Sequence, residues 1–251
     1  MNGLHRDEHD GALWLTLDRP PVNVLDIPTI QQLEAALAPL ASRADLRAVV
    51  LRSALPGTFS AGVDIRDHSR ERVAAMLEAF HRVFRLLNTL PQVTLAAVNG
   101  RCLGGGCELA VFCDFVLAAP EATFGQPEID VGCFPPVAAA LLPLIAGRGA
   151  AELVLLGSTC TADEAQRMGL VTRVAADLPG ETAALVARLA AKSASVLAVA
   201  RKALRQASHG GFEERLSRME RLYRDELLAT EDVEEGVRAF LEKRPARWRH
   251  R

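Results

Sequence analysis

The chain has 251 residues, of which 49% are hydrophobic and 24% charged, a composition typical of one large globular domain or one domain with a short appendage. A formal net charge of −2 gives no bulk basic field for nucleic acid or an anionic membrane. No apolar run reaches the roughly 20 residues that a membrane span needs, and the first segment, MNGLHRDEHDG, lacks the apolar region of a secretory signal. We therefore expect neither a nucleic-acid nor a membrane partner.

The first half of the chain alternates strand-like and helical stretches. Period-two or compact apolar runs predict strands, and apolar residues at helical spacing predict helices, one of which has Pro28 near its start. The predicted strands are residues 12–20, 46–53 and 93–100, and the predicted helices are residues 28–42 and 69–89. Strand-to-loop junctions that carry glycine favour an α/β fold with ligand sites at the strand ends.

The second half becomes progressively helical. Short strands are expected at residues 116–119 and 122–124, and from about residue 137 the chain is alanine-rich and helical. Residues 194–243 are interpreted as two or three helices, broken near HGGF and RPAR. The predicted organisation is a core over residues 1–190 and a helical C-terminal region over residues 191–251.

Two glutamates interrupt segments that are otherwise apolar or rich in glycine. Glu108 lies in NGRCLGGGCELAVFCDF and Glu128 lies twenty residues later in FGQPEIDVG. Apolar surroundings disfavour the ionised form of a carboxyl group, so its pKa rises and it becomes able to transfer protons near neutral pH. We therefore expect these two residues to be the chemically active pair.

Three glycine-bearing loops accompany the glutamates: FSAGVDI at residues 59–65, LGGGCEL at residues 103–109, and the Glu128 loop. Amides at glycine turns and at helix N-termini favour an anion. Two amides that converge on one oxygen form an oxyanion hole, in which each donor contributes roughly 3–4 kcal/mol to transition-state stabilisation. Taken singly, however, a GGG run is usually a packing or turn device.

Other site chemistries find less support. GRCLGGG does not match the dinucleotide motif GxGxxG, and no GxSxG nucleophile motif is present. The five cysteines and six histidines lack metal-ligand spacing, so no metal site is predicted, and His81 is expected to be a surface or partly packed residue. Cysteines in apolar segments are typical of small core residues in a reduced, cytoplasmic protein.

Taken together, these motifs resemble the crotonase, or enoyl-CoA hydratase/isomerase, family over nearly the whole chain. The matching segments run from LDRPPVNVLD through FSAGVDI, AAVNGRCLGGGCELAVFCDF, FGQPEIDVG and TADEAQRMGLVTRV to FLEKRPARW. The resemblance implies a spiral of ββα units followed by a helical trimerisation region, in a homotrimer or a dimer of trimers. It also implies an acyl-CoA substrate and no cofactor, since coenzyme A is part of that substrate.

The resemblance also implies roles for individual residues. The amides of Val63 and Gly105 would form the oxyanion hole for the thioester carbonyl, Glu108 would activate water, and Glu128 would exchange the proton at the α-carbon. Lys243 and Trp248 would lie near the adenosine phosphate and ring. The predicted coenzyme A and substrate contacts are Pro21, Val22, Val24, Ala61, Asp64, Ile65, Gly104, Phe134, Pro135 and Lys243.

One segment departs from the family pattern. Where hydratases have a glycine-rich stretch after the second glutamate, this chain has VGCFPPVAAALLPLIAG. The segment is similar to that of cyclohexa-1,5-diene-1-carbonyl-CoA hydratases of anaerobic aromatic degradation. A pocket lined by Phe134, Pro135 and Val137 should prefer a compact or cyclic acyl group.

The sequence-based conclusion is a lyase that adds water reversibly to an α,β-unsaturated acyl-CoA through a stabilised enolate. A double-bond isomerase needs the same enolate but no water, and it is the nearest alternative. A non-catalytic acyl-CoA-binding subunit is the alternative from a different class, although the presence of both glutamates argues against it.

Overall fold

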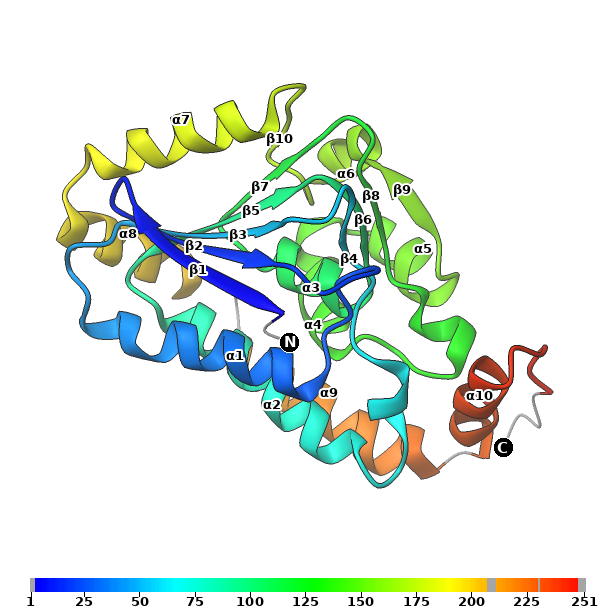
Figure 1. The fold of residues 1–251 in the computed structure, drawn as a ribbon. Helices are drawn as coiled ribbons and strands as arrows, with labels where there is room; N and C mark the ends of the chain where they lie inside the picture. The colour runs from blue at the N-terminus through cyan, green and yellow to red at the C-terminus, as the bar shows by residue number, and fades with distance from the viewer. Residues whose placement is uncertain (1–2, 207–210, 230, 248–251) are drawn as a thin grey trace.

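The structure is a computed structural model that describes residues 3–206, 211–229 and 231–247, and it contains two β-sheets covered by helices (Figure 1). The larger sheet has the strand order β1-β2-β3-β5-β7-β10 and the smaller one the order β4-β6-β8-β9. The strands of the larger sheet are β1 Leu4–His9, β2 Ala12–Leu17, β3 Ala48–Ser53, β5 Val93–Val98, β7 Phe115–Ala118 and β10 Arg173–Val174. Those of the smaller sheet are β4 Gly57–Ser60, β6 Gly100–Leu103, β8 Thr123–Gly125 and β9 Thr159–Thr161.

The chain passes repeatedly from the larger sheet to the smaller one. β3, β5 and β7 lie in the larger sheet, and each is followed by a strand of the smaller sheet, β4, β6 or β8, and then by helical structure. The first helices are α1 Ile27–Leu37, η1 Ala38–Ser42, η2 Ile65–His68, α2 Val73–Thr89, α3 Gly105–Val111, η3 Pro127–Val131 and α4 Pro136–Ile145. This repeated β-β-helix passage is the predicted crotonase-type spiral, and the α/β prediction is confirmed.

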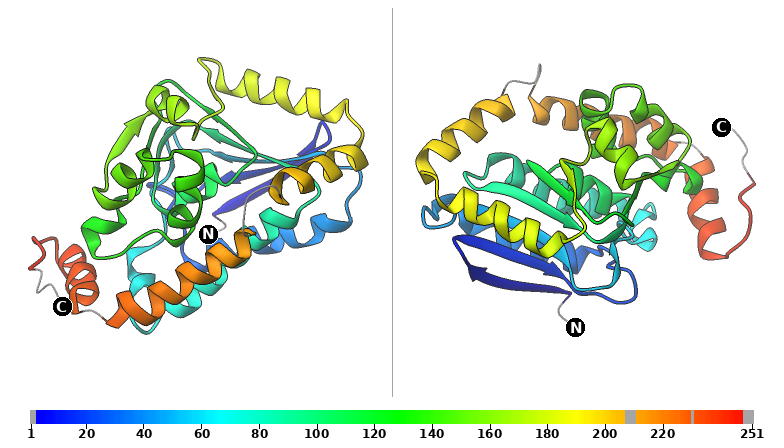
Figure 2. Two further views of the ribbon diagram at one scale, coloured as in Figure 1. Left: turned by 180° about the vertical axis from the view of Figure 1, so that it is seen from behind. Right: turned by 90° about the horizontal axis from the view of Figure 1, so that it is seen from above.

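Alternation along the strands of the larger sheet accounts for the layers on its two faces. Leu15 and Leu51 belong to the main core cluster, which also contains buried residues of α1 and α2. Trp14 and Val50, which point to the other face, cluster with Val186 and others of α7. The sheet is therefore packed between α1 and α2 on one side and α7 on the other (Figure 2).

The three C-terminal helices α8, α9 and α10 pack against different parts of this core. α8 contacts β5, α9 packs against α4 and α2, and α10 lies beside η2 and η3. The later helical elements are α5 Gly149–Leu155, α6 Ala162–Met168, α7 Leu178–Ala190, α8 Ala194–Gln206, α9 Phe212–Arg221, η4 Leu222–Glu226, η5 Leu227–Ala229 and α10 Glu231–Leu241. Within the described residues no single helix is long and apolar enough to cross a membrane; α7 and α8 pass that test only together, with a bend of 108° between them.

Several element boundaries differ from the sequence-based expectation. The predicted helix 28–42 is two elements, because α1 ends at Leu37 and a 3₁₀ segment containing Pro39 follows. The strand β1 was not predicted, since LHRDEH carries five exposed residues and no apolar alternation. It is an edge strand paired antiparallel with β2, and charged side chains are typical of such edges.

Candidate active site

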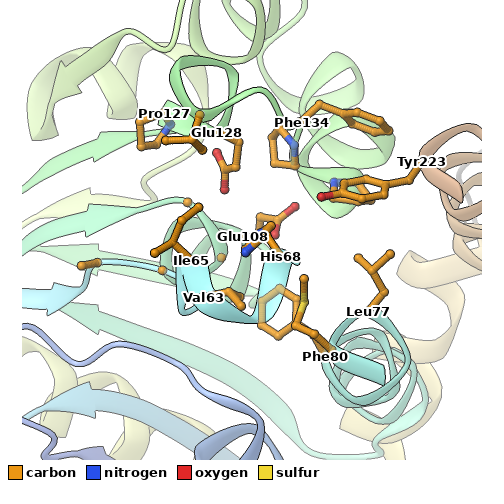
Figure 3. A pocket seen from close by; sticks show the side chains of 18 of the residues that line it. Val63, Ile65, His68, Leu77, Phe80, Glu108, Pro127, Glu128, Phe134 and Tyr223 are labelled. Carbon is orange, nitrogen blue, oxygen red and sulfur yellow. The ribbon is translucent and has the colours of Figure 1, made fainter. Parts of the chain in front are cut away.

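The candidate site lies at one end of the smaller sheet. β4, β6 and β8 are parallel neighbours, so the loops that follow their carboxyl ends meet at the same edge. These loops are the three glycine-bearing segments of the sequence. They open onto a cavity of about 340 Å³, here called the inner cavity (Figure 3). Its lining includes the predicted residues Ala61, Val63, Ile65, Gly104, Gly105, Glu108, Glu128, Phe134 and Pro135.

A second cavity, the outer cavity, adjoins the first and has a volume of about 870 Å³. The two cavities are adjacent, since both are lined by Ala61, Val63, Ile65 and Phe240. The remaining predicted contacts of the N-terminal loop and of the loop after β4 lie here: Pro21, Val22, Val24 and Asp64. The structure therefore forms one elongated site from segments about forty residues apart.

Two backbone amides are available at the inner cavity. Leu25 donates from its amide to the Gly62 carbonyl and accepts from the Asp64 amide, so the N–H of the intervening Val63 points away from Leu25. Gly105 is the first residue of α3, a position whose amide has no acceptor within the helix. The loops carrying these amides pack backbone to backbone, because a Cβ atom on Gly62 would lie 3.1 Å from the Gly105 nitrogen.

At each glycine of the GGG run, a side chain would come too close to a different neighbouring residue. A Cβ on Gly104, which has φ +53°, would lie 2.7 Å from Oε1 of Glu128. On Gly105 it would lie 2.7 Å from Cγ2 of Val63, and on Gly106 it would lie 2.5 Å from Cβ of Ser60. The absence of side chains thus lets the β4 loop and the Glu128 side chain close over the start of α3.

Glu108 projects from the first turn of α3 and is only 3% exposed. Its Oε1 accepts a hydrogen bond of 2.8 Å from the Ala138 amide at the start of α4. Pro135 and Pro136 have no N–H, so the first amides that α4 offers are those of Val137 and Ala138. Burial raises the pKa of Glu108 to about 7, although these two amides oppose the rise.

Glu128 lies in η3, and Figure 3 shows its carboxyl group facing the inner cavity opposite Glu108. Its Oε2 is buried and has no hydrogen-bond partner in the structure. Burial, and after it the charge of Glu108, raises the pKa of Glu128 to about 8. Two amides of α4 stabilise the Glu108 anion, whereas Glu128 has only its own backbone amide and is opposed by the charge of Glu108, so the geometry favours ionised Glu108 beside protonated Glu128.

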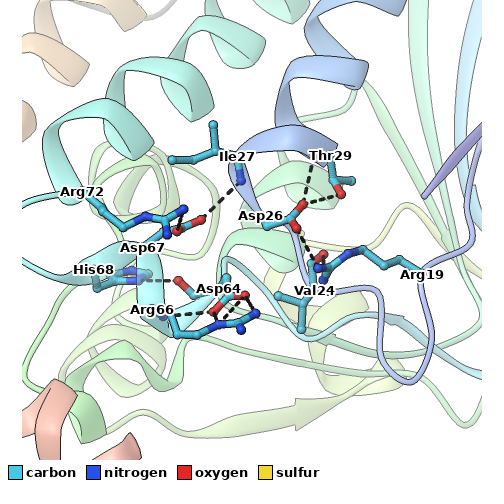
Figure 4. Close-up of polar contacts among 10 residues, drawn as sticks. All are labelled: Arg19, Val24, Asp26, Ile27, Thr29, Asp64, Arg66, Asp67, His68 and Arg72. Carbon is cyan, nitrogen blue, oxygen red and sulfur yellow. Dashed lines mark hydrogen bonds and ion pairs between the residues drawn. The ribbon is translucent and has the colours of Figure 1, made fainter. Parts of the chain in front are cut away.

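Ion pairs fix the loops that border the outer cavity (Figure 4). Asp64 is buried, caps η2 by accepting from the Arg66 amide, and pairs with the Arg66 guanidinium, which lowers the pKa of the carboxyl group. Asp26 caps α1 and pairs with Arg19 at 2.6 Å. The Asp64 carboxylate therefore already accepts its hydrogen bonds from Arg66. The Arg66 side chain is 67% exposed at the rim of the outer cavity.

Three residues that the sequence placed at the site either line neither cavity or lie outside the described residues. Val137 was expected to line the pocket, but the first turn of α4 directs it into the core, where it is fully buried, while Pro136 lines the inner cavity. Lys243 lies on an exposed turn after α10 and lines neither cavity. Trp248 lies outside the described residues.

The expectation for His81 was wrong, whereas the expectation that the cysteines are small core residues is confirmed. His81 is fully buried on α2, and its Nδ1 lies 2.8 Å from Oε1 of Glu220 on α9. Burial lowers the pKa of this imidazole, and Glu220 opposes the shift. All five cysteines are free and buried. No cluster of three or more potential metal ligands is found in the residues that the structure describes.

Several cavity residues were not identified from the sequence. Met76, Leu77 and Phe80 belong to the apolar pattern that predicts helix 69–89, and in the structure they pack in the core and also line the inner cavity. Tyr223 and Phe240 come from the C-terminal helical region, more than ninety residues after Glu128. No local sequence signal connects them with the glycine loops.

Comparison with known proteins gives consistent results. The model of the enoyl-CoA hydratase/isomerase family matches residues 7–251. The chain is 40% identical to a cyclohexa-1,5-dienecarbonyl-CoA hydratase of Thauera aromatica over 97% of this chain and 95% of that protein. It is 35% identical to a 2,3-dehydroadipyl-CoA hydratase of Escherichia coli over 97% of each. Among solved structures, an enoyl-CoA hydratase of Mycobacterium avium subsp. paratuberculosis superimposes with a TM-score of 0.87 at 29% identity, covering 98% of both chains.

Proposed function

Since this chain belongs to the enoyl-CoA hydratase/isomerase family, we propose that it is a lyase that adds water reversibly to the double bond of an α,β-unsaturated acyl-CoA. The observation that carries this proposal is the asymmetry of the two buried carboxyl groups. Glu108 is hydrogen-bonded by the Ala138 amide, whereas Glu128 has an oxygen with no partner. One group is thus poised to accept a proton and the other to donate one.

The thioester carbonyl would bind to the amides of Val63 and Gly105. As water adds to the β-carbon, the electrons of the double bond move toward that carbonyl oxygen, and the two amides stabilise the negative charge that develops there. Both amides are held by backbone contacts between the β4 and α3 loops, so they require no rearrangement when the charge appears.

The two glutamates would handle one proton each. Ionised Glu108 takes a proton from water as the new C–O bond forms, and protonated Glu128 delivers its proton to the α-carbon of the enolate. The reverse reaction exchanges these roles, and a proton must return from Glu108 to Glu128 between turnovers. The raised pKa values of both groups support proton transfer near neutral pH.

We further propose a ring-shaped acyl group, with a cyclic conjugated dienoyl-CoA as the preferred substrate. Phe80, Phe134 and Tyr223 supply flat apolar walls around the inner cavity, whose volume suits a compact group better than a long chain. The 40% identity to a cyclohexa-1,5-dienecarbonyl-CoA hydratase over almost the whole chain supports the same class. The coenzyme A part would occupy the outer cavity, and no cofactor beyond the substrate is proposed.

To test this proposal, the enzyme is incubated with cyclohexa-1,5-dienecarbonyl-CoA or with crotonyl-CoA, and the rate of the reaction and the mass of the product are measured. We expect a gain of one water and a higher kcat/KM for the ring substrate. Glu108→Gln and Glu128→Gln should each lower kcat by about 10²–10⁴-fold, the usual contribution of a positioned acid or base. Undiminished turnover in both variants would exclude the two-carboxylate mechanism.

The same assay separates the alternatives. A product of unchanged mass with a shifted double bond would indicate an isomerase. Binding of acyl-CoA without turnover of either substrate would indicate a non-catalytic subunit.

We also propose that the region 191–251 serves assembly into a homotrimer or a dimer of trimers, and that the protein acts in the cytoplasm. Val196, Val199 and Leu204 on α8 are apolar side chains that are 66–77% exposed in the single chain, which supports burial against another copy. Light scattering after size-exclusion chromatography tests the assembly. A monomer at micromolar concentration would contradict it. Free buried cysteines support a reducing compartment.

A further inference from the structure

The inner cavity contains a second buried polar atom without a partner, besides the carboxyl oxygen of Glu128. Among the described residues that line this cavity, two carry a buried side-chain oxygen with no hydrogen bond: Glu128, at Oε2, and Tyr223, at its hydroxyl. Glu128 is already accounted for, because its proton is used in the reaction. The Tyr223 hydroxyl has no such explanation.

Tyr223 is held firmly at the cavity wall. It lies in η4, a π-helical turn that follows α9, and it is 1% exposed. Its ring packs against Phe134, with 5.1 Å between the ring centres. Figure 3 shows the hydroxyl end pointing away from η4 into the cavity, toward the side from which Glu108 enters. Single π-helical turns inside helices occur frequently at functional sites.

Packing alone does not account for this hydroxyl. A phenylalanine would make the same ring contact with Phe134 without burying an unsatisfied polar atom, which is costly. The Cys133 thiol lies beside the hydroxyl and interacts with it, but the contact does not have hydrogen-bond geometry, and a thiol is a weak partner in any case. Burial, followed by the charge and side-chain contact of Cys133 and then by the charges of the two glutamates, raises the pKa of Tyr223, so the hydroxyl keeps its proton and can donate it.

The ligand must supply the missing partner. Leu77, Phe80 and Phe134 are apolar members of the same cavity lining, and a hydrocarbon ring or chain lying against them offers no hydrogen-bonding atom. Hydration brings one polar atom into this part of the cavity: the oxygen of the water, which becomes the hydroxyl of the product. We propose that Tyr223 is a further specificity-determining residue, whose hydroxyl hydrogen-bonds the oxygen that hydration adds to the acyl group. This inference rests on the proposed hydratase function.

The proposal predicts that Tyr223 distinguishes acyl groups with and without that hydroxyl. The test compares inhibition constants, from initial rates, for two ligands: the hydroxycyclohexenecarbonyl-CoA product and cyclohexanecarbonyl-CoA, a ring that lacks the hydroxyl. In Tyr223→Phe the constant for the product should rise about tenfold, the usual effect of losing one hydrogen bond in a buried site. The constant for the ring without a hydroxyl should change by less than about twofold.

A matched control is Thr182→Val. This substitution also removes a buried hydroxyl, one that donates to the Leu178 carbonyl within α7, away from both cavities. Neither inhibition constant should change in this variant. An equal rise for both ligands in Tyr223→Phe would show a packing role, and no change for either would show that the hydroxyl is idle; both results overturn the proposal.

A second measurement needs no substitution. The chain contains one tyrosine, so wild-type enzyme labelled with fluorotyrosine gives a single ¹⁹F resonance from this site. The product should displace that resonance further than cyclohexanecarbonyl-CoA does, and equal displacement would contradict the proposal. Wild-type enzyme that hydrates neither ring nor straight-chain substrates would overturn the proposed function, and this inference with it. Wild-type turnover without ligand discrimination would overturn the Tyr223 assignment alone.

Discussion

Opposite sides of the inner cavity are built from different parts of the chain. One side, here called the backbone floor, consists of residues 61–65 and 104–108, where glycines bring two loops into contact and leave amides free. The other side, the aromatic wall, consists of Phe134, Tyr223 and Phe240. Phe134 lies in the loop before α4, and the other two lie in η4 and α10 of the C-terminal helical region. The floor holds backbone amides in place through contacts between two loops, whereas the wall determines the shape of the cavity. We infer that the reaction depends on the floor and the choice of acyl group on the wall.

Among the changes that test this division between floor and wall, the largest effect is expected from adding one carbon to the floor. In Gly105→Ala the new Cβ would lie 2.7 Å from Cγ2 of Val63 and 3.0 Å from Cζ of Phe80, so the amides must move. Because a misplaced oxyanion donor costs about 2.7–4 kcal/mol, kcat should fall about 10²–10³-fold on every substrate. Gly211→Ala is the control, since a Cβ there meets nothing within 4 Å. A change in selectivity without loss of kcat would contradict the division between floor and wall.

The second largest effect is expected on the free energy of unfolding, and it comes from Glu128, which faces Glu108 across the inner cavity. The pKa of Glu128 rises from 4.5 to about 8 on folding, so the native state binds more protons than the unfolded state between these values, and stability should fall as pH rises through this range. Glu128→Gln removes this penalty. The free energy of unfolding of the variant should therefore exceed that of wild type by more at high pH than at low pH. The difference between variant and wild type should be on the order of 1–3 kcal/mol larger at about pH 9 than at about pH 5. Urea unfolding at both pH values measures the difference, and an equal gain would contradict the raised pKa.

A substitution in the aromatic wall should change selectivity more than catalysis. Phe134→Leu removes the ring that packs against Tyr223 and widens the cavity. We expect the preference for the ring substrate over crotonyl-CoA to fall about tenfold, as is typical of changes in an apolar pocket. The kcat for crotonyl-CoA should stay within about threefold of wild type. An equal loss on both substrates would show that the wall also supports the floor.

The smallest effect is expected at Phe240, which lines both cavities but is 54% exposed. Phe240→Ala should raise KM about two- to threefold on ring and straight-chain substrates alike, because it removes a partial contact and no reacting group. The kcat should remain unchanged. A fall in kcat alone would place Phe240 closer to the chemistry than its exposure indicates.

The same division explains which parts of the fold and site could be predicted. Strands β2, β3 and β5 and helix α2 follow local apolar periodicity, and the structure contains each of them. β1 has no such pattern and is defined only by its pairing with β2. Similarly, the floor lies within three glycine motifs that can be recognised in the sequence. Tyr223 has no motif, and it reaches the cavity only because α9 packs along α4.

Glycine spacing and apolar periodicity are local properties, so the sequence by itself determined the α/β class, the two glutamates and the glycine loops, and the resemblance of these motifs to a known family implied the spiral. The tertiary structure alone decided how the glutamates differ. The Ala138 amide, thirty residues beyond Glu108, stabilises one carboxylate, while the packing of η3 against Gly104 leaves Oε2 of Glu128 buried and unpaired. Burial and hydrogen bonding arise from segments that meet only in the folded chain, so pKa values and the aromatic wall could not be read from residue order.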